Sequence, residues 1–271
     1  MCKGFGVLLI GLLLTISGGI VRAGPPEDAA AAYNRGDYAT ALRLIPPLAS
    51  QGDSSAQYNL GLMYANGNGV PQNYAEAAKW YRLAADQGLV TAQNNLATMY
   101  ATDRGVPQNY AEALRWFRKA ADQGFDLAQN SLGIKYAKGE GTPQNPAEAA
   151  KWFRLAADQG YDAAQYNLGL MYEDGRGVTR NDAEAFKWYR LAAEQGYAMA
   201  QTNLGAMYEN GQGTARDYVR AHLWYNLSSA HGDQQGLNNR DIVAKRMTPA
   251  QIAEAQELAR VWKPTTQRLR P

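Results

Sequence analysis

A repeat of 36 residues is the feature that most limits how this chain can fold. The stretch AQYNLGLMYANGNGVPQNYAEAAKWYRLAADQG occupies residues 56–88 of a chain of 271, and four similar stretches follow it in the same register. The five stretches begin at Ala56, Ala92, Ala128, Ala164 and Ala200. A period between about 20 and 50 residues is typical of supersecondary units that stack on their neighbours. The sequence therefore predicts a stack of equal units.

The first half of each unit has the pattern of an amphipathic helix. Ala56, Leu60, Met63 and Tyr64 have the spacing i, i+4, i+7 and i+8, which places them on one helix face. Residues 66–73, NGNGVPQN, then supply glycines that can adopt left-handed turns and a proline that interrupts a helix. We expect the first helix of each unit to end in this loop.

The second half of each unit is also expected to be helical, because Ala77, Trp80, Tyr81 and Ala84 share one helix face. An asparagine precedes this helix and a glutamate follows three residues later, which is the pattern of a reciprocal capping pair. The pairs are Asn73 with Glu76, Asn109 with Glu112, Asn145 with Glu148, and Asn181 with Glu184. Each unit is therefore predicted to be helix, loop, helix and turn.

Repeated glycines and tryptophans indicate how these hairpins pack. Glycine inside a helix costs about 1 kcal/mol relative to alanine, so its recurrence in the first helix suggests that a neighbouring helix lies too close for a side chain. These glycines are Gly61, Gly133, Gly169 and Gly205. The tryptophan of each second helix can bury roughly 150–250 Å². One hairpin cannot cover that area, so neighbouring hairpins must stack into a solenoid.

The two halves of the repeat carry a family resemblance. The pattern A-Q-x-N-L-G-x-M-Y-x-x-G-x-G-V, followed by A-E-A-x-K-W-Y/F-R-x-A-A-x-Q-G, resembles the Sel1-like repeat, a 36-residue relative of the tetratricopeptide repeat. The resemblance covers residues 56 to about 235. It implies an all-α fold, a right-handed α-α superhelical solenoid of helix hairpins. In the register of Ala56, the five repeats are residues 56–91, 92–127, 128–163, 164–199 and 200–235.

Residues 24–55 are expected to cap the N-terminal end of the solenoid. The stretch GDYATALRLIPPLASQGD from Gly36 keeps the 36-residue register, with Tyr38 standing 36 residues before Tyr74. With a helix from about Glu27, this segment is interpreted as a partial repeat.

Residues 236–271 leave the repeat pattern and are expected to form C-terminal capping helices and a tail. One helix is predicted to begin at Pro249 after an N-cap at Thr248, and to be ended by Pro264. Trp262 is expected to pack on the last repeat.

Residues 1–23 have the pattern of a secretory signal peptide. A basic start at Lys3 precedes an apolar stretch at 7–16, and small residues precede an expected cleavage after Ala23. The alternative is a membrane anchor, but the apolar stretch is short and interrupted by glycines. The protein is therefore predicted to be periplasmic or secreted, without stable membrane insertion after cleavage.

Loss of this segment changes the charge and cysteine content of the mature chain. The chain has 27 basic and 25 acidic residues, and removal of Lys3 and Arg22 leaves no net charge. Such a balance lacks the excess of Lys and Arg that meets a phosphate backbone, so nucleic acid is not expected as a partner. The single cysteine, Cys2, is also lost, which excludes disulfides and thiolate metal sites.

The sequence argues against an enzyme and predicts no cofactor or metal. Catalytic groups are needed once, whereas the glutamates recur in the first turn of a helix, where they suit capping. The glycine loops lack phosphate-loop spacing. His222 and His231, the only histidines, do not have the spacing of ligands on one helix face. Some cysteine-rich relatives are associated with β-lactamase activity, but this chain lacks their cysteine pairs and a recognisable acylating serine.

A partner-binding groove is predicted on the side of the first helices opposite their core positions. A shift of two residues turns about 200° around a helix, so the positions equivalent to 58, 62, 65 and 66 lie opposite the core. The resemblance to tetratricopeptide repeats implies that this side lines the concave groove. The candidate residues are Tyr58, Leu62, Asn94, Thr98, Asn130, Ile134, Lys138, Tyr166, Leu170, Glu173, Asp174, Thr202 and Glu209.

Lys135 departs from the repeat, because it occupies a core position that holds methionine in the other four units. It is expected either to extend its amine to the surface along an apolar stem or to form an ion pair with a carboxylate of the ligand or of the next unit.

These observations predict a non-enzymatic scaffold or adaptor of the bacterial cell envelope that binds a peptide or partner protein in its groove, because aromatic and aliphatic residues among polar neighbours suit a protein ligand. Two alternatives stay open. A glycan- or exopolysaccharide-binding module would use Tyr58 and Tyr166 as stacking platforms. A hydrolase would need His222 or His231.

Overall fold

The structure is a computed structural model that describes residues 25–265, and within that range it contains fourteen α-helices and no strand. The all-α prediction is therefore confirmed. Residues 1–23, for which the sequence predicts a signal peptide, lie outside the described range. Every helix within that range is too short to span a lipid bilayer.

Ten helices of 13 residues form five consecutive hairpins. The first helices of the hairpins are α3 (Ser54–Asn66), α5 (Val90–Thr102), α7 (Asp126–Lys138), α9 (Asp162–Asp174) and α11 (Ala198–Asn210). The second helices are α4 (Tyr74–Asp86), α6 (Tyr110–Asp122), α8 (Pro146–Asp158), α10 (Asp182–Glu194) and α12 (Tyr218–Ala230). Each of these ten helices packs most extensively on a neighbour in the chain, as expected for a solenoid.

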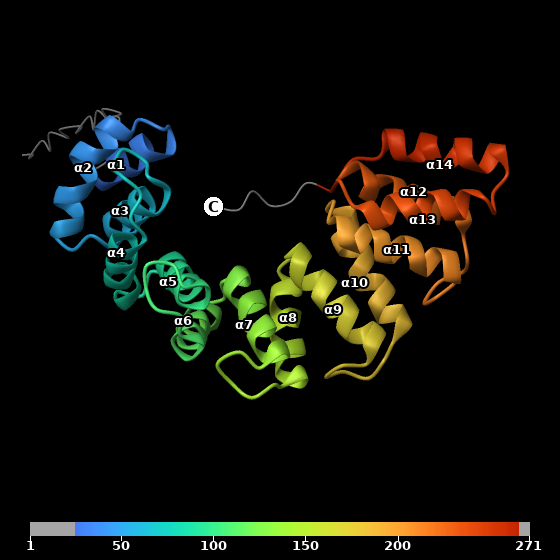
Figure 1. Cartoon of the computed structure of the whole chain (residues 1–271), viewed down its shortest axis with the longest axis horizontal. Coiled ribbons are helices and arrows are strands. Elements are labelled where there is room, and N and C mark those ends of the chain that lie inside the picture. Colours follow the sequence, from blue (N-terminus) through green and yellow to red (C-terminus); the bar gives the residue numbers. More distant parts are fainter. Residues whose placement is uncertain (1–24, 266–271) are drawn as a thin grey trace, which may run out of the picture.

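The hairpins follow one another along an arc, as Figure 1 shows. One end of the arc is made of α1 (Pro25–Asn34) and α2 (Tyr38–Ser50), and the other of α13 (Gln234–Ala244) and α14 (Pro249–Val261). The loops that join α7 to α8 and α9 to α10 lie on the outer side of the arc. The two capped ends therefore face one another across its open side.

A close contact inside each hairpin explains the glycine of the first helix. A Cβ atom on Gly169 would lie 2.6 Å from Cδ1 of Tyr189, whose ring packs against the glycine from the second helix. The same relation joins Gly61 to Tyr81, Gly133 to Phe153 and Gly205 to Tyr225. The expectation that a neighbouring helix excludes a side chain is confirmed.

Contacts between hairpins bury the repeated tryptophans and hold the loops. Trp188 packs in a cluster with Phe153 of the preceding hairpin and Met171 of its own hairpin, so a neighbouring unit helps to cover it as predicted. Each interhelix loop also approaches the preceding second helix. At Gly177, φ is +71° and a Cβ atom would lie 2.2 Å from the carbonyl oxygen of Pro146. Only glycine suits that position.

Paired glutamines make a further repeated contact, which the sequence reasoning missed. Gln93 Nε2 donates to the Ala85 carbonyl of the preceding hairpin (3.2 Å), and Gln123 Nε2 donates to Gln93 Oε1 (2.8 Å). Equivalent pairs join Gln57 to Gln87, Gln129 to Gln159, and Gln165 to Gln195. The glutamine that follows each repeated alanine was the available signal.

The predicted reciprocal capping pairs are only half formed. Asn73 Oδ1 accepts hydrogen bonds from the backbone N–H groups of Ala75 and Glu76, as an N-cap should. The glutamate does not return a bond, because the Asn73 N–H already donates to the Tyr64 carbonyl at 2.8 Å. The Glu76 carboxylate pairs instead with Lys79 at 2.6 Å. The reciprocal part of the prediction is therefore wrong.

The C-terminal cap agrees with the sequence in most details. Thr248 is the N-cap of α14 and Pro249 is its first residue, while the helix ends at Val261, three residues before Pro264. Trp262 packs edge-on against Trp224 of the last hairpin, with ring centroids 6.2 Å apart. This confirms its predicted contact.

Candidate partner-binding surface

The thirteen predicted groove residues lie on the five first helices, and we call the face that they occupy the first-helix face. Thr98, Lys138 and Asp174 are exposed. Partly buried are Tyr58, Leu62, Asn94, Ile134, Tyr166, Leu170, Glu173 and Glu209. Asn130 and Thr202 are buried, with 7% and 3% of their surface exposed.

The prediction that Asn130 and Thr202 line a groove is therefore wrong. Asn130 Oδ1 accepts a hydrogen bond from Asn167 Nδ2 of the next first helix at 2.9 Å. The Thr202 hydroxyl lies 2.7 Å from Ser228 Oγ and donates to Asp233 Oδ2 at 2.5 Å. Both side chains thus contribute to junctions between helices, which leaves them no surface for a partner.

The two tyrosines of this face are held by other aromatic rings. The Tyr58 ring centroid lies 5.7 Å from that of Tyr81. Tyr166 packs between Tyr189 (5.8 Å) and Tyr197 (5.2 Å). Burial raises the pKa of both Tyr58 and Tyr166 above its usual range. Rings covered in this way are poorly placed to stack on a sugar.

A surface hollow of 230 Å³ forms between the first helices α7 and α9. It brings together three of the predicted residues, Ile134, Lys138 and Leu170, and its lining also includes Phe153 and Arg176. The hollow thus combines aliphatic walls with basic side chains. Such a mixture suits an apolar side chain of a peptide flanked by polar groups.

Carboxylates gather toward the C-terminal end of this face. Glu173 Oε2 accepts a hydrogen bond from the Tyr189 hydroxyl at 2.5 Å. Burial first, and then the bond to Glu173, raise the pKa of Tyr189 far above its usual range. Asp174 is exposed and pairs with Arg176 at 3.1 Å. The tyrosine therefore stays protonated and holds the Glu173 side chain in place.

Lys135 follows neither expectation. Its amine lies 2.5 Å from Glu140 Oε2 in the loop of its own hairpin, and 4.8 Å from the ring centroid of Tyr110 in the preceding hairpin. The side chain is only 12% exposed. Lys135 thus joins two hairpins through an ion pair and a cation–π contact, and it is not available to a ligand.

The two histidines have separate surroundings at the C-terminal end. His222 is buried on α12, and burial together with nearby Arg240 lowers its pKa. His231 lies 3.3 Å from Gln201 Oε1 and extends the row of glutamine pairs. Among residues 25–265, no group of three or more His, Cys, Asp or Glu side chains could hold a metal ion. Both histidines therefore take part in packing: His222 is buried in the last hairpin, and His231 contacts Gln201.

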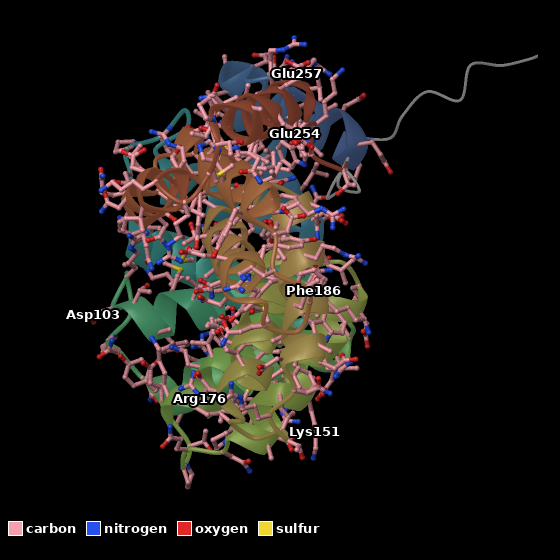
Figure 2. The ribbon with its side chains drawn as sticks, turned by 90° about the vertical axis from the view of Figure 1, so that its right-hand side faces the viewer. Asp103, Lys151, Arg176, Phe186, Glu254 and Glu257 are labelled. Carbon is pink, nitrogen blue, oxygen red and sulfur yellow. The ribbon has the colours of Figure 1, made fainter. Side chains whose placement is uncertain are left out.

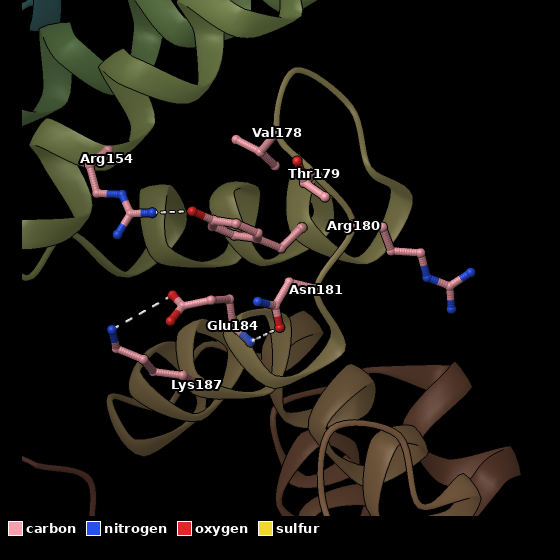
Figure 3. A pocket seen from close by; sticks show the side chains of 8 residues that line it. Arg154, Val178, Thr179, Arg180, Asn181, Glu184 and Lys187 are labelled. Atoms are coloured by element: carbon pink, nitrogen blue, oxygen red, sulfur yellow. Dashed lines mark hydrogen bonds and ion pairs between the residues drawn. The ribbon is translucent and has the colours of Figure 1, made fainter.

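A larger open hollow of 520 Å³ lies where α8, α9 and α10 meet, and Figure 3 shows its lining. Arg154 donates to the Tyr172 hydroxyl across one side, while Lys187 lies 3.7 Å from Glu184 on another. Its charged groups thus largely satisfy one another. The Arg154–Tyr172 contact recurs as Arg82–Tyr100 and Arg118–Tyr136, so this edge of the hollow belongs to the repeated packing between hairpins.

An all-helical solenoid whose packing residues repeat while its first-helix face varies has the form of a repeat scaffold for binding other molecules. The Sel1 repeat family model matches residues 54–89, 90–125, 126–161, 162–197 and 198–233. The chain belongs to the Sel1 repeat family. Each matched segment begins at the first residue of a first helix, two residues before the predicted repeat boundary.

Two solved structures are similar to this chain. A Sel1 repeat protein from Oxalobacter formigenes is 32% identical, with a TM-score of 0.76 over 86% of this chain and 98% of that one. A protective antigen of uropathogenic Escherichia coli strains that displays an SLR fold is 30% identical, over 88% of this chain and 68% of that one, with a TM-score of 0.43. No curated protein matches the chain significantly. Sel1 repeat proteins generally mediate protein–protein interactions, and their fold is typically a non-catalytic scaffold.

Proposed function

We propose that this chain is an exported, non-enzymatic scaffold of the bacterial cell envelope, and that its first-helix face binds a peptide or a partner protein. The hollow between α7 and α9 carries this proposal, since Ile134, Lys138 and Leu170 line it and each keeps part of its surface exposed. The signal-peptide pattern of residues 1–23 supports export.

The glycan alternative depends on Tyr58 and Tyr166 as exposed stacking platforms. Both rings pack against other tyrosines in the hairpin stack. A protein ligand fits this face better, because aliphatic and charged side chains surround the available space.

The test is affinity capture from envelope extract of the source organism, with purified residues 24–271 as bait. The binding variant combines Leu170→Lys with Lys138→Glu. The matched control makes the same two changes on α8, Leu155→Lys and Lys151→Glu, where Leu155 is 47% and the Lys151 side chain 72% exposed. Lys151 is labelled near the lower edge of the molecule in Figure 2.

We expect wild type and control to retain the same protein, and the binding variant to lose it while circular dichroism shows an intact fold. Equal retention by all three baits would place the interface on another surface. A mature N-terminus other than Gly24, measured by mass spectrometry of the intact protein, would contradict the expected cleavage.

A further inference from the structure

Two glutamates occupy the same position in the last two hairpins. Glu173 is the penultimate residue of α9 and Glu209 is the penultimate residue of α11, one repeat of 36 residues apart. Each accepts a hydrogen bond from the tyrosine of its own second helix, Tyr189 for Glu173 at 2.5 Å and Tyr225 for Glu209 at 2.9 Å. The three earlier hairpins have alanine at this position: Ala65, Ala101 and Ala137. The pair of tyrosine and glutamate is therefore confined to one end of the solenoid.

Glu209 has a cationic partner. Its Oε1 atom lies 3.1 Å from Arg246 Nη1, while its other carboxylate oxygen accepts from the Tyr225 hydroxyl. Arg246 follows α13, which begins 36 residues after α11 and so stands where a sixth first helix would be. The structure thus shows which group binds a glutamate at this repeat position. It is a guanidinium that comes from the position of the next repeat.

Glu173 has no such partner among residues 25–265. One repeat before Arg246 stands Asn210, which carries no charge. Arg176 forms its ion pair with Asp174 and Arg180 forms its ion pair with Asp182, each at 3.1 Å, and Arg180 acts on Glu173 only as a positive charge nearby. The Tyr189 hydroxyl holds Glu173 in place, so its second oxygen offers a prepared acceptor for a cation.

We propose that Glu173 receives a Lys or Arg side chain of the partner, in the way that Glu209 receives Arg246. This inference rests on the proposed function, because it requires a partner on the first-helix face. Leu170 lies one helical turn before Glu173 and lines the aliphatic hollow. The recognised segment therefore carries a basic residue beside an apolar one.

The experiment uses a displayed library of random heptapeptides, selected against the mature protein at low salt. The binding of retained peptides is then measured for wild type, Glu173→Gln and Leu170→Lys. Glu112→Gln is the matched control, because it makes the same change on the second helix α6, away from the first-helix face, at a carboxylate that pairs with Arg115 at 3.1 Å. Asn210→Arg is the second variant, designed to place an internal guanidinium on Glu173 as Arg246 is placed on Glu209.

We expect retained peptides to carry Lys or Arg beside an aliphatic residue, and Glu173→Gln to weaken them by about 10-fold or more. Asn210→Arg should weaken them similarly without lowering the melting temperature, whereas Glu112→Gln should leave peptide affinity unchanged. Binding to wild type should fall as salt is raised, because salt screens the attraction between the Glu173 carboxylate and the cation of the peptide.

The outcomes separate this inference from the proposed function. Peptides that are lost with Leu170→Lys but bind Glu173→Gln as tightly as wild type would overturn the role of Glu173 and leave the binding face intact. Retained peptides without a basic residue would overturn it as well. If no peptide is retained, or if Leu170→Lys weakens none, the proposed binding face fails together with this inference.

Discussion

His231 Nδ1 lies 3.3 Å from Gln201 Oε1, at the position where the four earlier hairpins place a glutamine. Gln201 Nε2 already donates to the Ala193 carbonyl at 3.2 Å, so its oxygen faces the histidine as an acceptor. His231 therefore ends the row of side-chain pairs that joins the hairpins. The last pair is longer than the glutamine pairs, which measure 2.7–2.8 Å.

Replacing His231 with glutamine should stabilise the protein. The longer amide side chain can restore the shorter hydrogen bond of the other pairs, which is worth about 0.5–1 kcal/mol. Urea unfolding followed by circular dichroism measures the effect. Gln195→His, which makes the reverse change one repeat earlier, should destabilise the protein. A His231→Gln variant that unfolds at a lower urea concentration than wild type would contradict this account.

Two glycines with positive φ should respond differently to alanine. At Gly160, φ is +91° and an added Cβ would meet no atom within 4 Å, so Gly160→Ala should cost only the backbone strain of about 1 kcal/mol. At Gly177 the added Cβ would also collide with the Pro146 carbonyl at 2.2 Å. Gly177→Ala should therefore cost about 3 kcal/mol or more. Equal melting temperatures of the two variants would show that the loop yields without cost.

The stability of the C-terminal end should depend on pH through His222. Burial and the nearby Arg240 lower its pKa in the folded protein, while Asp241 acts in the opposite direction. The unfolded chain then binds more protons than the folded one below the ordinary value of 6.5. The free energy of unfolding should fall as the pH drops from about 7 to about 5.

The control for this pH dependence is His222→Phe, since Phe186 stands at the same position one repeat earlier. We expect the variant to lose less stability than wild type over the same pH range in urea titrations. Parallel losses in both proteins would assign the pH dependence to other groups.

The contact of Trp262 with the last hairpin should stabilise the packing of the C-terminal cap. Its ring meets Trp224, and three residues later the Thr265 N–H donates to the Glu194 carbonyl at 2.8 Å. Trp262→Ala should destabilise the protein by about 2 kcal/mol and speed limited proteolysis near α14. Val261→Ala, at a side chain 54% exposed, should change stability by less than about 0.5 kcal/mol. Unchanged proteolysis of Trp262→Ala would contradict a role in holding the cap.

Much of the candidate surface could be predicted by placing the residues of each first helix around a helical wheel. Eleven of the thirteen selected residues retain exposed surface. The wheel failed at Asn130 and Thr202 for a physical reason. It reports which way a side chain leaves its own helix, but not that Asn167 or Ser228 from a neighbouring helix covers it. Lys135 was misread likewise, since its partners Glu140 and Tyr110 lie outside its own helix.

The sequence by itself determined the hairpin, its helix ends and its repetition, because these depend on local spacing, turn glycines and N-cap residues that act within one unit. Only the tertiary structure decided which carboxylate is paired and which is open. Glu173 and Glu209 are equivalent in sequence, yet Arg246 reaches only Glu209. That difference arises from what stacks next to each hairpin, a contact between units that the residues of one unit do not specify.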